Sequence, residues 1–199
     1  GITTPFHVSP TGIQLPQYQV NHTQELPNSV FHFGSMDWMP NEEAVLWFIN
    51  NVWEKVLTKV PQAKFYVIGR GMGDKILSLS KPNVVVVGKI QNAEKVYHHY
   101  SVMVVPLLSG SGMRIKMIEG MAYAKPIVST NIGAEGIAVV PGKTCLLADN
   151  ATDFANAVIE ILNDNDKKKL LQSEARNFIE QHFENNFLVK QVVDFYKTL

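Results

Sequence analysis

The sequence predicts an α/β protein: a doubly wound parallel sheet of the Rossmann-like type, followed by carboxy-terminal helices. Two observations support this class. Short apolar segments alternate with segments of helical periodicity between residues 30 and 150. One apolar segment, Val84 to Val87, consists of valine alone, which is typical of a parallel strand covered by helices on both faces. Strands connected in this way are joined by right-handed crossovers.

The elements follow one another at short intervals. Residues 1–29 hold four prolines and no sustained period, so we expect a connector there. The first strand is expected at 30–34, and a helix capped by Asn41 then runs to Lys59, with Pro61 stopping it. Further strands are expected at 64–69, 83–87, 102–106, 126–129 and 145–148, with helices at 74–79, at 93–100 and after residue 112.

The last fifty residues have the pattern of helices throughout. We expect residues 30–183 to form one domain and residues 184–199 a final helix. The methionines Met113, Met117 and Met121 recur every four residues, which indicates a buried helix face in the domain rather than a sulfur site.

Composition excludes several classes of function. Hydrophobic residues make up 46% of the 199 residues and charged residues 18%, with a formal net charge of zero. A neutral balance argues against a nucleic-acid partner and against strong electrostatic attachment to membranes. The lone Cys145 fits a reducing compartment, and neither a membrane span nor a signal-peptide pattern is evident. We therefore expect a cytoplasmic protein, with peripheral membrane attachment of a longer full-length chain left open.

The segment after the strand at 102–106 has the pattern of an anion site. A loop of small residues, Ser109 to Gly112, precedes a helix whose first turns carry Arg114 and Lys116. Backbone N–H groups at the positive end of a helix dipole attract phosphate, and the two cations add full charges. Spacing alone also permits a simpler interpretation, in which Lys116 and Glu119 form an exposed ion pair on that helix.

Other candidate ligand residues follow the remaining strands. In doubly wound sheets, ligands bind outside the carboxyl ends of the strands. Three segments at such ends begin with or follow glycine: Gly34-Ser35, Gly69-Arg70 and Lys89-Ile90. Each glycine can simply end a strand, but together they favour close approach of the backbone to a ligand. Their spacing does not make the dinucleotide fingerprint, and no metal-ligand spacing or nucleophilic triad is evident, so we expect neither cofactor nor metal.

These residues resemble a known family. From Val30 to Phe183 the chain resembles the carboxy-terminal half of a GT-B fold glycosyltransferase, of the large retaining group called glycosyl transferases group 1. The motifs that carry the resemblance are Tyr66-Val67-Ile68-Gly69, Val86-Val87-Gly88-Lys89-Ile90, Pro106 with its loop, Ile118-Glu119-Gly120-Met121-Ala122, and Lys125-Pro126-Ile127-Val128-Ser129-Thr130 followed by Gly133.

The resemblance implies a function for each candidate segment. This half of such enzymes holds a nucleotide diphosphate sugar, and an amino-terminal domain holds the acceptor. That domain is missing here, and residues 1–29 would include its tail and the linker. Glu119 corresponds to the carboxylate on the ribose hydroxyls, and Gly112 and Met113 to the backbone donors at the helix start that hold the diphosphate. Lys89 and Ile90 fall near the base, with Gly69-Arg70 at a neighbouring strand end. The implied reaction transfers a sugar with retention of configuration.

The sequence departs from the family at two points. Ser111 stands where the family commonly has a Glu that contacts the donor sugar, and no Arg or Lys follows the first strand at Gly34-Ser35 to bind phosphate. Arg114 and Lys116 are expected to supply those charges from the opposite side and to stabilise the departing diphosphate.

Three interpretations therefore remain. The first is a glycosyltransferase donor domain that is inactive alone. The second is a GT-B relative with other chemistry, such as a nucleotide-sugar epimerase, or a non-catalytic nucleotide-binding module, and the third is a flavodoxin-like or receiver-like interaction domain. A receiver needs clustered acids after its first strand, and only Asp37 is near that position.

Overall fold

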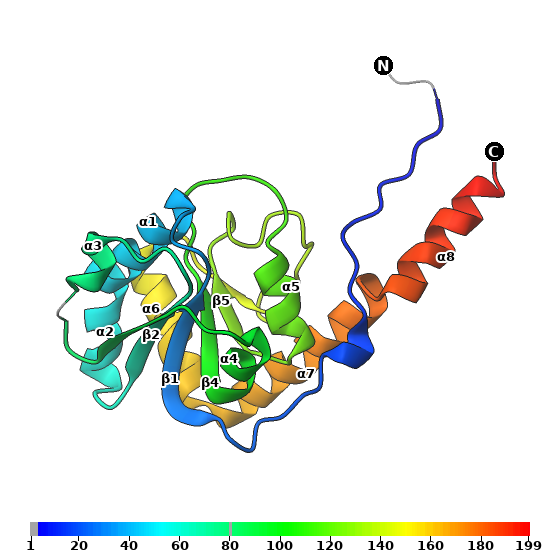
Figure 1. Ribbon diagram of the computed structural model, residues 1–199. Coiled ribbons are helices and arrows are strands. Elements are labelled where there is room, and N and C mark those ends of the chain that lie inside the picture. Colours follow the sequence, from blue (N-terminus) through cyan, green and yellow to red (C-terminus); the bar gives the residue numbers. More distant parts are fainter. Residues whose placement is uncertain (1–3, 80) are drawn as a thin grey trace.

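The computed structural model describes residues 4–79 and 81–199, so residues 1–3 of the expected connector lie outside the described residues. Six strands form one sheet in the order β3-β2-β1-β4-β5-β6, and every pair is parallel (Figure 1). The predicted doubly wound α/β class is confirmed. The strand order reverses between β1 and β4, which is where this class of sheet binds ligands. The strands are β1 (Leu26–Phe33), β2 (Lys64–Ile68), β3 (Val84–Gly88), β4 (Tyr100–Val105), β5 (Ile127–Ser129) and β6 (Leu146–Leu147).

Helices cover both faces of the sheet, and each face has its own apolar core. Val30 of β1 belongs to one core and its neighbour Phe31 to the other, because successive side chains of a strand point to opposite faces. One face carries α1 (Met39–Trp47), η2 (Phe48–Val52), α2 (Trp53–Lys59), α3 (Asp74–Leu77) and α6 (Ala151–Asn163); the other carries α4 (Ala93–His99), α5 (Ile115–Ala122) and α7 (Asn165–His182).

The first helix begins earlier than the sequence predicts. It starts at Met39, with Pro40 in the first turn, where the missing N–H of proline costs no hydrogen bond. The predicted cap at Asn41 is therefore wrong: Asn41 is buried inside the helix, and its side chain donates a hydrogen bond to Ser35 O at 2.8 Å. This hydrogen bond holds the Asn41 side chain beside the carboxyl end of β1.

The valine strand is not covered on both faces, so that expectation is wrong. β3 is an edge strand, and Val85 and Val87 each remain 38% exposed. The helix that follows β3 packs elsewhere. Tyr97 of α4 contacts Phe31 and Phe33 of β1, with ring centroids 6.3 and 5.8 Å apart. The outer face of β3 is left open as a result.

The amino-terminal segment, described from residue 4, lies beside the last helix, away from the sheet (Figure 1). Figure 1 shows α8 (Asn185–Tyr196) and the amino-terminal segment extending from the body of the domain. The segment pairs with the chain before α8 through a β-bridge between Ile13 and Glu184, and His7 stacks on Phe195 at 5.5 Å. A short 3-10 turn, η1 (Leu15–Gln17), follows. Across the described residues, no helix is both long and apolar enough to cross a membrane.

A buried ion cluster closes the amino-terminal end of the sheet. The side chain of Lys125 is fully buried and donates to Glu25 Oε1 at 2.6 Å and to Tyr100 O at 3.0 Å. Lys168 of α7 bonds the other oxygen of Glu25, and His22 Nδ1 lies 3.3 Å from Oε1. Burial alone would raise the pKa of Glu25, but the hydrogen bond from His22 and the two lysine charges outweigh it and lower that pKa to about 2.

Candidate functional site

The structure brings six of the predicted site residues around one cavity. This cavity of about 250 Å³ lies where β1, β2 and β3 end, and its lining includes Gly34, Ser35, Gly69, Arg70, Lys89 and Ile90, together with Phe33. The residues are up to 56 positions apart in the sequence (34 to 90), so the sheet topology alone unites them. Their predicted proximity is confirmed, and their roles toward a ligand stay predictions.

Gly69 has a reason to be glycine that involves no ligand. Its φ is +145°, and a Cβ at this position would lie 1.7 Å from the carbonyl oxygen of Gly34. The ends of β1 and β2 therefore touch through their backbones. Close approach of chain to chain, rather than of chain to ligand, accounts for this glycine.

Arg70 lies at the rim of the cavity. Its Nε is 3.5 Å from Asp37 Oδ2 and 3.3 Å from Ser35 Oγ, and its side chain is 71% exposed. An exposed pair of this kind contributes little to stability. The guanidinium is therefore free to turn toward a bound molecule at small cost.

Lys116 reaches across the sheet to the same edge. Its Nζ donates to Asn41 Oδ1 at 2.6 Å and lies 3.3 Å from His32 Nε2. His32 Nδ1 lies 3.1 Å from Val104 O, which can only accept, so Nδ1 carries the proton and Nε2 accepts from Lys116. A Cβ on Gly34 would lie 3.0 Å from the lysine amine. The amine therefore lies directly beside the end of β1.

The surroundings of Lys116 contain no compensating acid. No carboxylate lies within ion-pair distance of its amine among the residues that the structure describes. Burial, with a smaller effect from the Arg114 charge, lowers the pKa of Lys116 to about 7. Burial and the neighbouring Lys116 also hold the pKa of His32 well below its ordinary value. A bound anion would favour the charged form of the lysine.

The alternative interpretation of Lys116 and Glu119 as an exposed ion pair is wrong. Lys116 extends toward β1, whereas Glu119 accepts a hydrogen bond from the Tyr97 hydroxyl at 3.3 Å. Burial raises the pKa of Glu119, and the Tyr97 hydrogen bond opposes this effect. Glu119 is thus a partly buried acceptor, one turn along α5 from the lysine.

The small-residue loop does not lead straight into the helix. Gly112 has a φ of +89°, and Arg114 is extended with φ −91° and ψ 95°, so α5 cannot begin before Ile115. Gly112 and Met113 therefore lie in the turn directly before α5, and their role as donors to a diphosphate stays a prediction. The N–H of Gly112 donates to Glu135 Oε2 at 3.0 Å.

Arg114 is buried within this loop, with only 7% of the residue exposed. Its Nη1 donates to Ser111 O at 2.7 Å, and its guanidinium carbon lies 5.0 Å from the centroid of the Trp38 ring. Its Nε and Nη2 are buried and have no hydrogen-bond partner in residues 4–79 and 81–199. Buried N–H groups without partners are rare in proteins and require an explanation.

Three residues of this region were missed by reasoning from sequence: His32, Asn41 and Glu135. His32 is the polar residue within the apolar run from Val30 to Phe33, which is the clearest signal of the three. Asn41 precedes an apolar period in the sequence, which predicts a helix cap rather than a contact with a partly buried lysine. Glu135 lies between small residues after β5, and nothing in its spacing relates it to Gly112.

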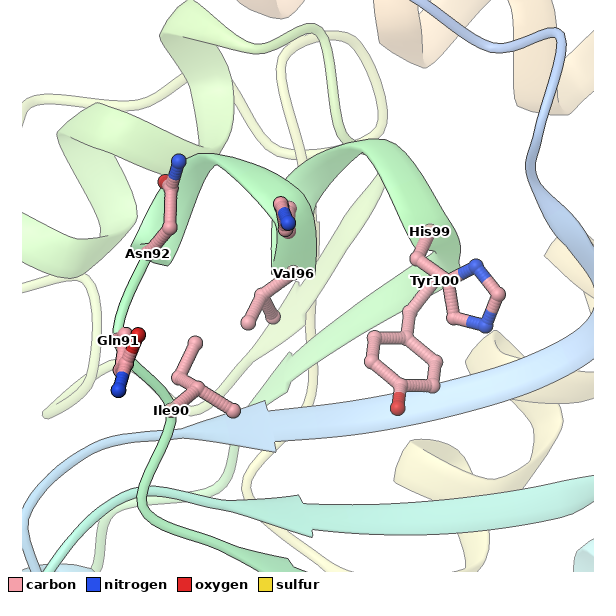
Figure 2. A pocket seen from close by; sticks show the side chains of 7 residues that line it. Ile90, Gln91, Asn92, Val96, His99 and Tyr100 are labelled. Carbon is pink, nitrogen blue, oxygen red and sulfur yellow. The ribbon is translucent and has the colours of Figure 1, made fainter.

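A second cavity adjoins the first and shares Ile90 with it. Its volume is about 440 Å³, and its other lining residues are Gln91, Asn92, Lys95, Val96, His99 and Tyr100. Figure 2 shows Ile90 and Val96 pointing toward one another beneath α4. The loop after β3 is thus bordered by open space on both sides. Within the described chain, no group of three or more His, Cys, Asp or Glu side chains is placed to hold a metal ion.

Comparisons with known proteins agree with this architecture. The family model for glycosyl transferases group 1 matches residues 27–164. An uncharacterized 44.6 kDa protein from the cps region of Klebsiella pneumoniae is 23% identical over 157 residues, which cover 74% of this chain and 40% of that protein. An uncharacterized glycosyltransferase of Methanocaldococcus jannaschii is 34% identical over 80 residues, covering 39% of this chain and 22% of that protein. The chain therefore spans less than half the length of these relatives.

Solved structures share the fold at lower identity. The carboxy-terminal domain of LpcC, a group 1 family glycosyl transferase from Francisella tularensis, has a TM-score of 0.69 at 13% identity, covering 87% of this chain and 100% of that domain. A variant of S. aureus TarM, in complex with fondaparinux, alpha-GlcNAc-glycerol and UDP, has a TM-score of 0.73 at 19% identity, covering 97% of this chain and 38% of TarM. Anabaena HepE in complex with UDP has a TM-score of 0.67 at 14% identity, covering 94% of this chain and 56% of HepE.

The parallel sheet with its 3-2-1-4-5-6 order, the edge of the sheet that gathers the predicted residues, and the family match over residues 27–164 lead to one conclusion. The chain belongs to glycosyl transferases group 1 and has the Rossmann-like fold of a GT-B carboxy-terminal domain.

Proposed function

We propose that this chain is the donor-binding half of a glycosyltransferase, which transfers a sugar from a nucleotide diphosphate sugar to an acceptor with retention of configuration. One observation supports this most strongly. Lys116 and Arg114 bring two cations, neither within 4 Å of a carboxylate of the described chain, to the edge of the sheet where the ends of β1 and β4 part. Such a pair fits the diphosphate of the donor.

The remaining predicted residues take complementary roles in this proposal. The cavity formed by Gly34, Ser35, Gly69, Arg70, Lys89 and Ile90 receives the nucleoside. Glu119, a carboxylate already bonded to a hydroxyl, accepts hydrogen bonds from the ribose. Met113 and Ser111 lie on the loop beside Arg114, where the diphosphate and the sugar meet.

The chemistry asked of this half is electrostatic. Breaking the bond between the sugar and the diphosphate leaves negative charge on the departing group. Cations fixed before the reaction stabilise that charge without further reorganisation, and groups of this kind contribute on the order of 3 kcal/mol each. In this proposal the acceptor and its activating groups come from an amino-terminal domain outside the sequence, so the isolated chain binds nucleotide and transfers little sugar.

Arg114→Ala tests the proposed site. We expect the affinity for UDP or GDP, whichever binds the native chain, to fall at least tenfold, since a charge-assisted pair with phosphate is lost. Isothermal titration calorimetry measures this, with Lys55→Ala on α2 as a control that removes a cation from the other face of the sheet. Equal affinity of Arg114→Ala and the native chain would contradict the proposal.

The reaction itself is tested with the full-length protein. Sugar transfer with an α-configured product from an α-configured donor supports a retaining transferase. Conversion of the nucleotide sugar to its epimer without transfer would instead support the alternative that this is a GT-B relative with epimerase chemistry.

A further inference from the structure

Glu135 occupies the loop that the proposed function assigns to the diphosphate. Its Oε2 accepts the N–H of Gly112 at 3.0 Å. The backbone of the next residue packs on the same turn, since a Cβ on Gly136 would lie 3.7 Å from Met113 Cβ. A carboxylate from the loop after β5 is thus held against the turn that precedes α5.

The same turn contains unused hydrogen-bond donors. A Cβ on Gly110 would lie 3.1 Å from Arg114 Nη2, so the guanidinium lies against the loop backbone. Its Nε and Nη2 lack partners in the described part of the chain, although the residue is 93% buried (100% less the 7% exposed). Glu135 bonds the loop amide and leaves these two donors free. A ligand with several acceptor oxygens would satisfy both the amide and the guanidinium.

We propose that Glu135 is an internal anion that occupies the diphosphate position in the nucleotide-free protein, and that the donor displaces it on binding. The proposal rests on the proposed function. One N–H cannot serve a carboxylate and a phosphate equally well, and two anions at one amide repel. For unit charges 4 Å apart in water, the repulsion amounts to a factor of about five in affinity.

The structure makes displacement inexpensive. Glu135 is exposed, and the N–H of Gly112 is the sole hydrogen-bond partner of its carboxylate within residues 4–79 and 81–199. Gly136 follows it with a φ of +79°, a conformation that glycine leaves easily. The carboxylate therefore occupies the diphosphate position through a single hydrogen bond that a ligand can replace. The charge of Glu135 weakens the binding of anionic ligands and leaves uncharged ones unaffected.

Glu135→Gln tests the proposal, because it keeps the side chain and its hydrogen-bond acceptor but removes the charge. By calorimetry we expect about fivefold tighter binding of UDP or GDP than by the native chain. Uridine or guanosine, which lack phosphate, should bind both forms equally. Glu54→Gln is the matched control, since Glu54 is an exposed carboxylate on α2, at the other face of the sheet.

Inorganic pyrophosphate provides a readout that does not depend on the nucleotide. The amide NMR signal of Gly112 should move on titration with pyrophosphate, at lower concentration in Glu135→Gln than in the native chain. Unchanged or weaker binding of UDP, GDP and pyrophosphate by the variant overturns the inference. If the native chain binds pyrophosphate at Gly112 but neither nucleotide, the proposed function fails while the displacement of Glu135 stands.

Discussion

Lys116, in the first turn of α5, and Lys125, just after its end, have contrasting surroundings. Lys125, at the amino-terminal end of the sheet, is fully buried and bonded to the carboxylate of Glu25 at 2.6 Å. Lys116, at the carboxyl end, is only partly buried and has the neutral partners Asn41 and His32. Burial lowers the pKa of both, but the charge of Glu25 opposes this effect at Lys125, and the pKa of Lys116 falls to about 7.

The difference teaches which cation is available to a ligand. A buried charge is stable only when it is paired, and Lys125 already has its pair. Lys116 has hydrogen bonds but no counter-charge, so an incoming anion can provide one. The two lysines therefore differ in their charged neighbours as well as in the extent of their burial.

The largest expected effect is on the structural side of the comparison. Glu25→Gln leaves the buried Lys125 and the partly buried Lys168 without a carboxylate, and we expect it to lower the free energy of unfolding by about 3 kcal/mol. Urea denaturation measures this. Nucleotide affinity should not change, because the cluster lies at the opposite end of the sheet from the cavity. A stability within 0.5 kcal/mol of the native value, roughly the noise for surface changes, would refute the structural role of the cluster.

The same cluster predicts an acid transition. The pKa of Glu25 is about 2 in the folded chain against a usual value of 4.5. The native state therefore binds fewer protons than the unfolded state between these values, and the contribution of Glu25 is present above pH 4.5 and lost as the pH falls toward 2. Denaturation midpoints at pH 5 and pH 3 should differ more in the native chain than in Glu25→Gln.

Lys116→Met should have the opposite pattern. We expect nucleoside diphosphate affinity to fall about tenfold or more, as for the loss of a charge-assisted hydrogen bond. Stability at pH 7 should stay equal or rise by about 1 kcal/mol, because a partly buried cation without a counter-charge is removed. A drop in melting temperature together with unchanged affinity would show that Lys116 is structural like Lys125.

The pH dependence of stability provides a second measurement of the state of Lys116. The pKa of Lys116 is about 7 when folded and 10.5 ordinarily, so the unfolded chain binds more protons in this window. Stability therefore increases from pH 7 toward pH 10 in the native chain. Urea denaturation at pH 7 and pH 9 should show less of this increase in Lys116→Met.

The smallest expected effect concerns Glu119. Its carboxylate should select ribose, so the native chain should bind UDP or GDP several-fold more tightly than the 2′-deoxy form, because the deoxy sugar leaves an acceptor unpaired. In Glu119→Gln we expect this preference to shrink. Competition binding with the two nucleotides measures the ratio, and an unaltered ratio would assign Glu119 to Tyr97 alone.

Reasoning from sequence found the layers, because alternation of apolar and helical periods depends on local pattern. It also placed the ends of β1, β2 and β3 together, since parallel strands share one edge. Reasoning from sequence failed where tertiary contacts determine the position of a strand in the sheet. Val85 and Val87 do not reveal that β3 is an edge strand, because strand order is not encoded locally.

The site was predicted in outline and missed in its connections. The spacing of Lys116 and Glu119 permitted an ion pair, yet the side chain of Lys116 crosses to His32, 84 positions earlier in the sequence. The bond between Gly112 and Glu135 likewise joins two loops through folding alone. Charges near one another in sequence predicted an anion site, but only the fold shows which of them lack partners.

Proton uptake on nucleotide binding tests the central claim most directly. Calorimetric titration with UDP or GDP at pH 8, in two buffers of different ionisation enthalpy, counts the protons taken up per nucleotide bound. With a pKa of about 7, Lys116 is largely neutral at pH 8 and should gain most of one proton when the diphosphate arrives. We expect this uptake in the native chain and not in Lys116→Met. Binding without proton uptake by the native chain would contradict the account.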